Sequence, residues 1–280
     1  MLEILKDAVL DSVKLVPFLF VTYLIMEYLE HKTSDKHKEH IKKSGKWGPV
    51  IGALLGAFPQ CGFSVSATNL YVGRVISLGT LIAVYLSTSD EMIPVFLAEN
   101  IGADVILKVL GIKILIGMFV GIILDLIFQK ETQENEISHL CEHAHCHCEE
   151  GVVKSSIKHT VNITIFIFII SLILNALIAW IGEETISNLI LNKPILGPVI
   201  SGLVGLIPNC AASVIIAELY IGQMISSGTM IAGLLVGAGV GLLVLAKENR
   251  NKKENVKIIS ILYLTGVIFG IVLELLGLTL

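Results

Sequence analysis

Two short motifs place a cysteine directly after a helix-breaking proline: Pro59-Gln60-Cys61 and Pro208-Asn209-Cys210. Each proline interrupts an apolar stretch, 47–73 in the first case and 196–222 in the second, so each cysteine begins the second arm of a broken helix. Main-chain N–H groups and the positive end of the helix dipole favour a thiolate or an anionic ligand at that position. We therefore predict that Cys61 and Cys210 bind the substrate. The alternative is that both are ordinary buried cysteines.

Polar side chains accompany both cysteines. Gln60 and Asn209 precede them, and Ser64 and Ser213 lie one helical turn further along the same faces. Their amide and hydroxyl groups would complete a pocket that contains sulfur and has pseudo-symmetry. Capping of the exposed helix ends is an equally good interpretation of these four residues.

Carboxylates within apolar segments form a second set of candidate residues. Asp90 and Glu91 lie about two-thirds of the way along one apolar segment, and Glu218 lies in another. Such acids are rare in membrane spans and usually serve an ion pathway or a proton relay, so we predict a coupling role for these three. Asp125 and Glu274 lie near helix ends, from where they could reach the lipid headgroups.

A third group of reactive side chains lies in the polar segment between the two halves of the chain. Its histidines and cysteines are His139, Cys141, His143, His145, Cys146, His147 and Cys148. Imidazole and thiolate ligands select ions such as Zn²⁺, Cu⁺ and Cd²⁺, and thiolates bind trivalent arsenic. The spacing does not match a folded zinc finger, so a solvated linker with incidental metal affinity is the alternative.

The composition indicates what kind of scaffold must position these groups. Of the 280 residues 54% are hydrophobic and 16% are charged, against about 25% charged in soluble domains. Six apolar segments are long enough to span a bilayer: about 7–30, 76–98, 104–128, 157–181, 225–246 and 255–278. The arms of the two broken stretches cover only about 18 Å each, which predicts re-entrant hairpins. The expected fold is an all-α polytopic membrane protein.

Several function classes can be set aside on the same grounds. The net charge of −4 offers no basic surface for nucleic acid, and the chain lacks the Gly-rich phosphate loop of ATP-hydrolysing proteins. We therefore expect no enzyme activity and no tightly bound cofactor. The expected partners are the lipid bilayer and a metal or metalloid ion as substrate, and a homo-oligomer is compatible with the sequence.

The sequence repeats itself at an offset of 149 residues. Residues 46–83 and 195–232 share 19 identities in 38 positions without a gap. Each half contains a long helix, a hairpin broken at Pro-x-Cys and two further long helices, which predicts eight to ten membrane segments. An odd number of crossings inverts the second half relative to the first, as in many secondary transporters. We place the repeats at 1–128 and 157–280 and a linker at 129–156.

The positive residues predict an orientation for this arrangement. Three polar loops hold 14 of the 20 Lys and Arg residues: 31–46, 129–158 and 247–257. The positive-inside rule places these loops in the cytoplasm and the amino terminus outside.

These motifs together resemble a known family. The paired Pro-Gln-Cys-Gly and Pro-Asn-Cys-Ala breaks, the Gly-Thr helix after each, Ser87-Thr88-Ser89-Asp90-Glu91 and the Cys/His-rich linker are similar to the ten-transmembrane heavy-metal exporters. That family is related by name to arsenic efflux permeases, and some of its members are labelled manganese transporters. The resemblance covers nearly the whole chain and implies a transporter of the prokaryotic inner membrane that exports a metal or metalloid.

The function predicted from the sequence is a secondary transporter that exports a soft heavy metal or metalloid by alternating access, coupled to protons. Three alternatives stay open. Manganese could be carried on Asp90 and Glu91, because Mn²⁺ prefers oxygen ligands. Thiols at helix amino ends would also suit a sulfur-containing anion such as thiosulfate, which would make the protein an importer. A membrane thiol oxidoreductase could use Cys61 and Cys210 as an exchangeable pair.

Overall fold

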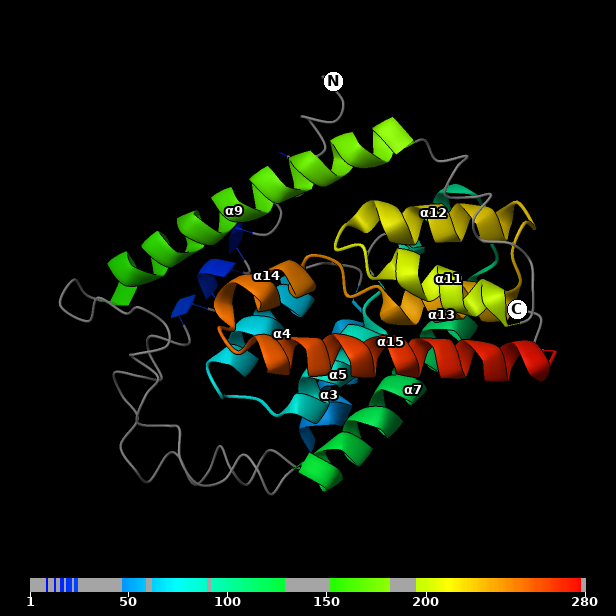
Figure 1. The fold of residues 1–280 in the computed structure, drawn as a ribbon, viewed down its shortest axis with the longest axis horizontal. Helices are drawn as coiled ribbons and strands as arrows, with labels where there is room; N and C mark the ends of the chain where they lie inside the picture. The colour runs from blue at the N-terminus through cyan, green and yellow to red at the C-terminus, as the bar shows by residue number, and fades with distance from the viewer. Residues whose placement is uncertain are drawn as a thin grey trace.

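The computed structural model describes residues 47–58, 62–89, 92–128, 152–181 and 195–277, and single positions between 9 and 24. Every regular element in these stretches is an α-helix, as the composition predicts. The first half contains α3 (Gly48–Gly56), α4 (Gly62–Val72), α5 (Leu78–Ser87), α6 (Met92–Ala98) and α7 (Ala103–Phe128). The second half contains α9 (Val152–Ile181), α11 (Leu196–Gly205), α12 (Cys210–Ile221), α13 (Ser227–Val236), α14 (Gly241–Glu248) and α15 (Lys252–Leu275) (Figure 1).

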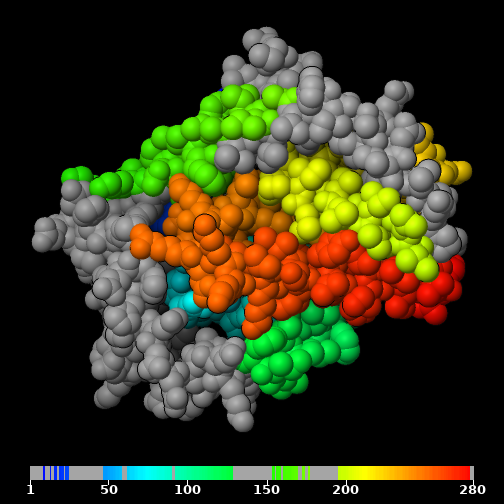
Figure 2. Space-filling view, in the orientation of Figure 1, coloured from blue at the N-terminus to red at the C-terminus, as the bar shows by residue number. Residues whose placement is uncertain are grey.

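Four of the described helical stretches are long and apolar enough to cross a membrane: Leu78–Ala98, Ala103–Phe128, Ser227–Glu248 and Lys252–Leu275. The two that contain α5 and α13 are 69% and 83% buried, whereas α7 and α15 are only 33% and 28% buried. The helices α5 and α13 therefore form the centre, and α7 and α15 turn apolar side chains outward, as lipid-facing helices do. Figure 2 shows α15 lying along one face of the molecule. The chain is an integral membrane protein.

The helices of the two halves correspond in order and position. The helices α11 to α15 begin 148 or 149 residues after α3 to α7. Their packing corresponds as well, because α5 lies against α3 and α7 just as α13 lies against α11 and α15. Even the helix starts agree: Ser77 accepts a hydrogen bond from the Thr80 N–H at the start of α5, and Ser226 accepts one from the Thr229 N–H at the start of α13.

Close contacts fix the directions of the first-half helices. A Cβ added to Gly48, at the start of α3, would lie 2.3 Å from the Thr80 hydroxyl near the start of α5. At the other end of α3, a Cβ on Gly56 would lie 2.2 Å from the Ser87 hydroxyl at the end of α5. The helices α3 and α5 therefore run in the same direction. Because α4 joins the end of α3 to the start of α5, it runs in the opposite direction.

A short helix of each half packs against the other half. The helix α4 packs against α14 of the second half, and α12 packs against α6 of the first half. The Thr68 hydroxyl in α4 lies 3.3 Å from the carbonyl oxygen of Gly241, where α14 begins. The rings of Phe96 in α6 and Tyr220 in α12 are stacked with their centroids 6.2 Å apart. The two halves therefore share one interior.

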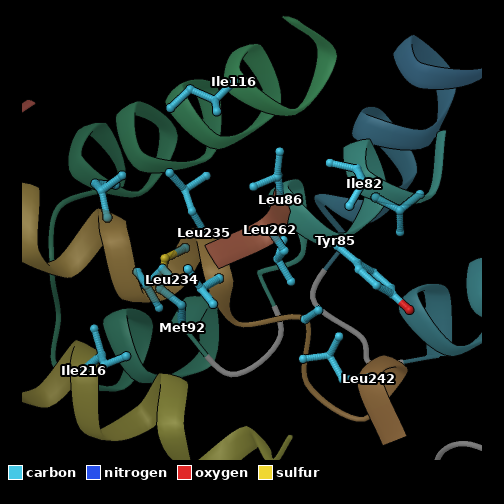
Figure 3. Packing of buried hydrophobic residues seen from close by; sticks show 14 of the residues in the cluster. Ile82, Tyr85, Leu86, Met92, Ile116, Ile216, Leu234, Leu235, Leu242 and Leu262 are labelled. Carbon is cyan, nitrogen blue, oxygen red and sulfur yellow. The ribbon is translucent and has the colours of Figure 1, made fainter. Parts of the chain in front are cut away.

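The apolar core lies where α5 and α13 meet. Leu86 and Leu235 are fully buried and Leu234 is nearly so. Figure 3 shows these leucines together, with Tyr85 at the edge of the cluster and its hydroxyl directed away from them. A smaller core joins the first predicted helix to α9 and α14, with Leu19 packed among residues of both.

Two predicted spans are present but are not continuous helices. The span predicted at 76–98 is α5 followed by α6, and the span predicted at 225–246 is α13 followed by α14. At the first interruption the Thr88 hydroxyl donates to the Val84 carbonyl oxygen (2.7 Å), so a side chain competes with the main chain for that acceptor. At the second, Gly239 has a φ of 55°, which favours glycine and ends a right-handed helix.

Candidate functional site

The second-half motif lies at the start of α12. Pro208 and Asn209 follow the end of α11, and Cys210 is the first residue of α12 and is 7% exposed. The Asn209 side-chain oxygen accepts the Ala211 N–H (3.2 Å), which makes Asn209 the cap of the helix. The Ser213 hydroxyl donates to the Cys210 carbonyl oxygen (2.7 Å). These contacts hold the helix start, and with it the Cys210 thiol.

The first-half motif, Pro59-Gln60-Cys61, lies outside the described residues, between α3 and α4. Ser64, one turn into α4, is fully buried. A Cβ added to Gly241 would lie 3.0 Å from Ser64 Cβ, so Ser64 is packed against the start of α14. The structure thus places Ser64 at the boundary between the two halves.

Two further hydroxyl groups meet beside Ser64. The hydroxyls of Thr68 and Tyr85 are 2.6 Å apart, and both side chains are buried. The Tyr85 hydroxyl also lies 3.3 Å from the Gly241 carbonyl oxygen. This cluster joins α4, α5 and the start of α14 through oxygen atoms alone. The sequence offered no motif for it, because Thr68 and Tyr85 are 17 residues apart and lie in different helices.

The end of α5 carries a run of three buried hydroxyl side chains. Ser87, Thr88 and Ser89 are each at most 2% exposed. The Ser89 hydroxyl donates to the Ala57 carbonyl oxygen at the end of α3 (2.8 Å). Asp90 and Glu91, which follow this run in the sequence, lie outside the described residues, so the structure does not test their predicted coupling role.

A buried lysine lies at the same place. Lys113, in the middle of α7, is 1% exposed. Its ammonium donates to the carbonyl oxygen of Thr88 at the end of α5, and to that of Leu234 near the end of α13 (2.7 Å). Sequence reasoning missed this residue. The signal was available, since a lysine in an apolar span is as unusual as the acids that were singled out.

Three of these buried polar side chains have apolar equivalents in the second half: Ala217 for Thr68, Leu234 for Tyr85 and Leu262 for Lys113. Ser64 differs from them, because its equivalent is Ser213. The shared helices therefore do not require the polar side chains. Polar side chains at these three positions in one repeat only point to a function beyond folding.

Asp125 and Glu274 each contact the start of a central helix. Asp125 accepts hydrogen bonds from the Ser77 hydroxyl (2.7 Å) and from the Gly79 N–H (2.8 Å), at the start of α5. Glu274 accepts one from the Ser226 hydroxyl, at the start of α13. Each acid thus satisfies groups at the amino end of a central helix.

Most of the other predicted ligand and coupling residues lie outside the described residues. No group of three or more His, Cys, Asp or Glu side chains forms among the described residues. Glu218 is an exposed residue of α12. The predicted linker is described only from Val152, where α9 begins, so its Cys/His cluster lies outside the described residues.

Comparison with known proteins bears on what this helical scaffold does. Residues 1–187 match the family described as "Putative, 10TM heavy-metal exporter", which is two-thirds of the chain. The chain belongs to this family. No curated protein and no solved structure matches the chain. The resemblance read from the sequence motifs is therefore confirmed at the level of the heavy-metal exporter family.

The exporter match spans the first half of the chain and α9. It includes every residue of the buried polar cluster, from Ser64 to Lys113, as well as Cys61. The family is a class of transporters, not of enzymes. The heavy-metal exporter assignment thus covers the half in which the buried polar groups are found.

Proposed function

We propose that the protein is a secondary transporter that exports a soft heavy metal or metalloid across the prokaryotic inner membrane by alternating access. One observation carries this proposal beyond the family: buried polar groups gather where the interrupted helices of both halves end. Irregular backbone at membrane depth is tolerated where it is enclosed by protein or lines a path for polar cargo. Transporters place their substrate sites at such breaks, between two repeats.

Inverted repeats would supply the two states of this transporter. Arg74, after α4, is paired with Glu254 at the start of α15, and Phe96 at the end of α6 is stacked on Tyr220 at the end of α12. In the orientation predicted from charge, the first pair lies on the cytoplasmic side and the second pair on the outer side. These contacts are those expected if α4 and α12 are re-entrant arms that enter from opposite faces.

The thiols of Cys61 and Cys210 are the proposed cargo ligands. The helix start at Cys210 is held by Asn209 and Ser213, which would keep the thiol at the amino end of α12. Cys61 has the same place in the repeated sequence, and Gln60 and Ser64 are the equivalents of its neighbours. Thiolates select soft ions and bind trivalent arsenic.

Asp90 and Glu91 are the proposed proton-coupling acids, with Glu218 as a third candidate. They follow Thr88, whose carbonyl oxygen accepts a hydrogen bond from the Lys113 ammonium. A positive charge close to this segment would reduce the cost of placing carboxylates within a membrane. The linker cluster at 139–148 would concentrate metal ions in the cytoplasm before export.

The test is ion accumulation in everted membrane vesicles, which turns export into uptake. Trivalent arsenic, Zn²⁺, Cd²⁺, Mn²⁺ and thiosulfate are compared for the wild type and the Cys61→Ser/Cys210→Ser variant. We expect one soft ion to accumulate and the variant to lose uptake by more than about tenfold. The matched control replaces the linker thiols Cys141, Cys146 and Cys148 by serine and should retain transport through the membrane site.

Two other results would favour the alternative functions. Accumulation of Mn²⁺ alone, unaffected by loss of the two thiols, would show that the cysteines are not the site and would favour Asp90 and Glu91. A redox-dependent shift of the wild type on a non-reducing gel, without any ion uptake, would favour the thiol oxidoreductase.

A second candidate function is import of a sulfur-containing anion such as thiosulfate. The observation that favours it is the buried Lys113 ammonium, a fixed positive charge in the middle of the molecule. With helix amino ends at both cysteines, this charge would suit an anion. Uptake of thiosulfate by right-side-out vesicles, and not by everted ones, would select this function.

A further inference from the structure

The Lys113 ammonium joins the carboxyl ends of two equivalent helices. Thr88 is the residue that caps α5, and Leu234 lies in the last turn of α13. Carbonyl oxygens in the last turn of a helix have no partner within that helix, and they carry the negative end of its dipole. Both carbonyl groups accept a hydrogen bond from the same Nζ atom, although they come from different halves of the chain.

We infer that Lys113 is the resident cation of a carbonyl site formed by the carboxyl ends of α5 and α13. The inference rests on the transport function proposed above. It adds the identity of the cation that occupies the carbonyl site. In transporters with broken helices, the carboxyl ends of half-helices and their free carbonyl groups bind a coupling cation such as Na⁺. In this protein the chain itself provides the cation, so transport requires no Na⁺ at this position.

The surroundings of Lys113 indicate a specific cation site and not an incidentally buried lysine. Leu262, its equivalent in α15, is fully buried and apolar, so the positive charge is present once for two equivalent helix ends. Lys108 lies on the same helix only five residues earlier, but its side chain is 56% exposed and is 3.6 Å from Asp104. The two lysines of α7 therefore have different roles, and Lys108 provides a matched control.

Removing the lysine side chain should leave a cavity with a defined ligand. Lys113→Ala deletes Cγ, Cδ, Cε and Nζ, which together have the structure of n-propylammonium. This small cation would restore the charge and the N–H donors at the two carbonyl oxygens. Tetramethylammonium has the charge without the donors, and propan-1-ol has a similar shape without the charge.

The experiment uses the full-length protein in proteoliposomes and the ion identified in the vesicle assay. We expect Lys113→Ala to lower transport by about tenfold or more, because the carbonyl groups lose a charged hydrogen-bond partner. Added n-propylammonium should restore transport with a saturable dose dependence, and tetramethylammonium and propan-1-ol should not. Lys108→Ala should transport as the wild type does, and wild-type transport should be the same with Na⁺ or choline in the buffer.

The inference is overturned if n-propylammonium does not restore transport, if wild-type transport requires Na⁺, or if Lys113→Met transports as fast as the wild type. The thermal stability of purified Lys113→Ala gives a readout that does not depend on transport. It should rise with n-propylammonium and be unchanged by tetramethylammonium. If the wild type moves none of the ions tested, the proposed function fails, and this stability measurement still decides whether the carbonyl site binds a cation.

Discussion

Arg74 and Glu254 form an ion pair of two hydrogen bonds between the end of α4 and the start of α15, with N–O distances of 3.0 and 3.3 Å. The Tyr71 hydroxyl and the Asn249 amide donate to the same carboxylate. The pair joins a hairpin arm of the first half to the last helix of the second. It therefore fixes how the two halves meet at that end of the molecule.

Removing this ion pair should weaken the protein at the junction of its halves. We expect Arg74→Ala to lower the free energy of unfolding by about 1 kcal/mol, because the pair is only partly exposed and has two parallel bonds. Glu254→Ala should lower it by more, because Tyr71 and Asn249 then lose their acceptor as well. The double variant should lose much less than the sum. Thermal unfolding in detergent measures this, with the exposed pair Asp104 and Lys108 as the control, whose removal should cost under about 0.5 kcal/mol. Strict additivity would contradict the pairing.

Close packing of α5 on α7 predicts different results for two glycines of one helix. A Cβ on Gly121 would lie 2.6 Å from the Gly79 carbonyl oxygen and 2.9 Å from Ala83 Cβ, whereas nothing lies within 4 Å of a Cβ on Gly111. Gly121→Ala should therefore destabilise the protein by about 1–3 kcal/mol through overpacking. Gly111→Ala should be neutral or stabilise it by up to about 1 kcal/mol. Thermal unfolding compares the two, and equal effects would exclude the close approach.

The Tyr85 hydroxyl should matter for transport more than for folding. Tyr85→Phe removes the oxygen that meets Thr68 and the Gly241 carbonyl, at a cost of about 1 kcal/mol in stability. Tyr263→Phe is the matched control, because its hydroxyl donates to the Val199 carbonyl oxygen of the second half (3.2 Å). We expect similar losses of stability, but reduced ion uptake only for Tyr85→Phe. Equal uptake by the two variants would remove the hydroxyl cluster from the proposed pathway.

The depth of the first hairpin can be tested at Phe58, just after α3. A helix of 9 residues covers about 14 Å, less than half of the bilayer core. A single cysteine in place of Phe58, in a variant without native cysteines, should react slowly with a membrane-impermeant thiol reagent applied from outside, because only the outward-open state exposes it. Cysteine at Asn100, between α6 and α7, should react from that side. Labelling of the Phe58 position from outside as fast as that of the Asn100 position would mean that both arms span the membrane.

Much of this architecture was predictable because the signals were local and repeated. Apolar segments of sufficient length predicted the spans, and the offset of 149 residues predicted equivalent helices in both halves. The start of α12 at Cys210 follows from Pro208, which cannot continue a helix. The breaks after α5 and α13 were not predicted, since hydroxyl side chains and glycine only weaken a helix, and whether it breaks depends on tertiary contacts.

The buried polar cluster was predictable only in part. Asp90 and Glu91 were singled out as charges in an apolar segment, and the same reasoning applied to Lys113 would have found it. The partners of Lys113 were not accessible to that reasoning, because they are main-chain oxygens of residues 25 and 121 positions away. The contacts of Asp125 and Glu274 with the starts of α5 and α13 were equally inaccessible, because they join residues 46 to 48 positions apart.

The packing of α4 on α14 and of α12 on α6 makes each half depend on the other if the chain is cut between them. A separate first half would expose the face of α4 that α14 covers, and a separate second half would expose the face of α12 that α6 covers. Neither fragment has a complete interior, so each should be unstable alone and recover when the two are produced together. A shorter relative with a single repeat would face the same need, and could meet it only by pairing two copies in opposite orientations.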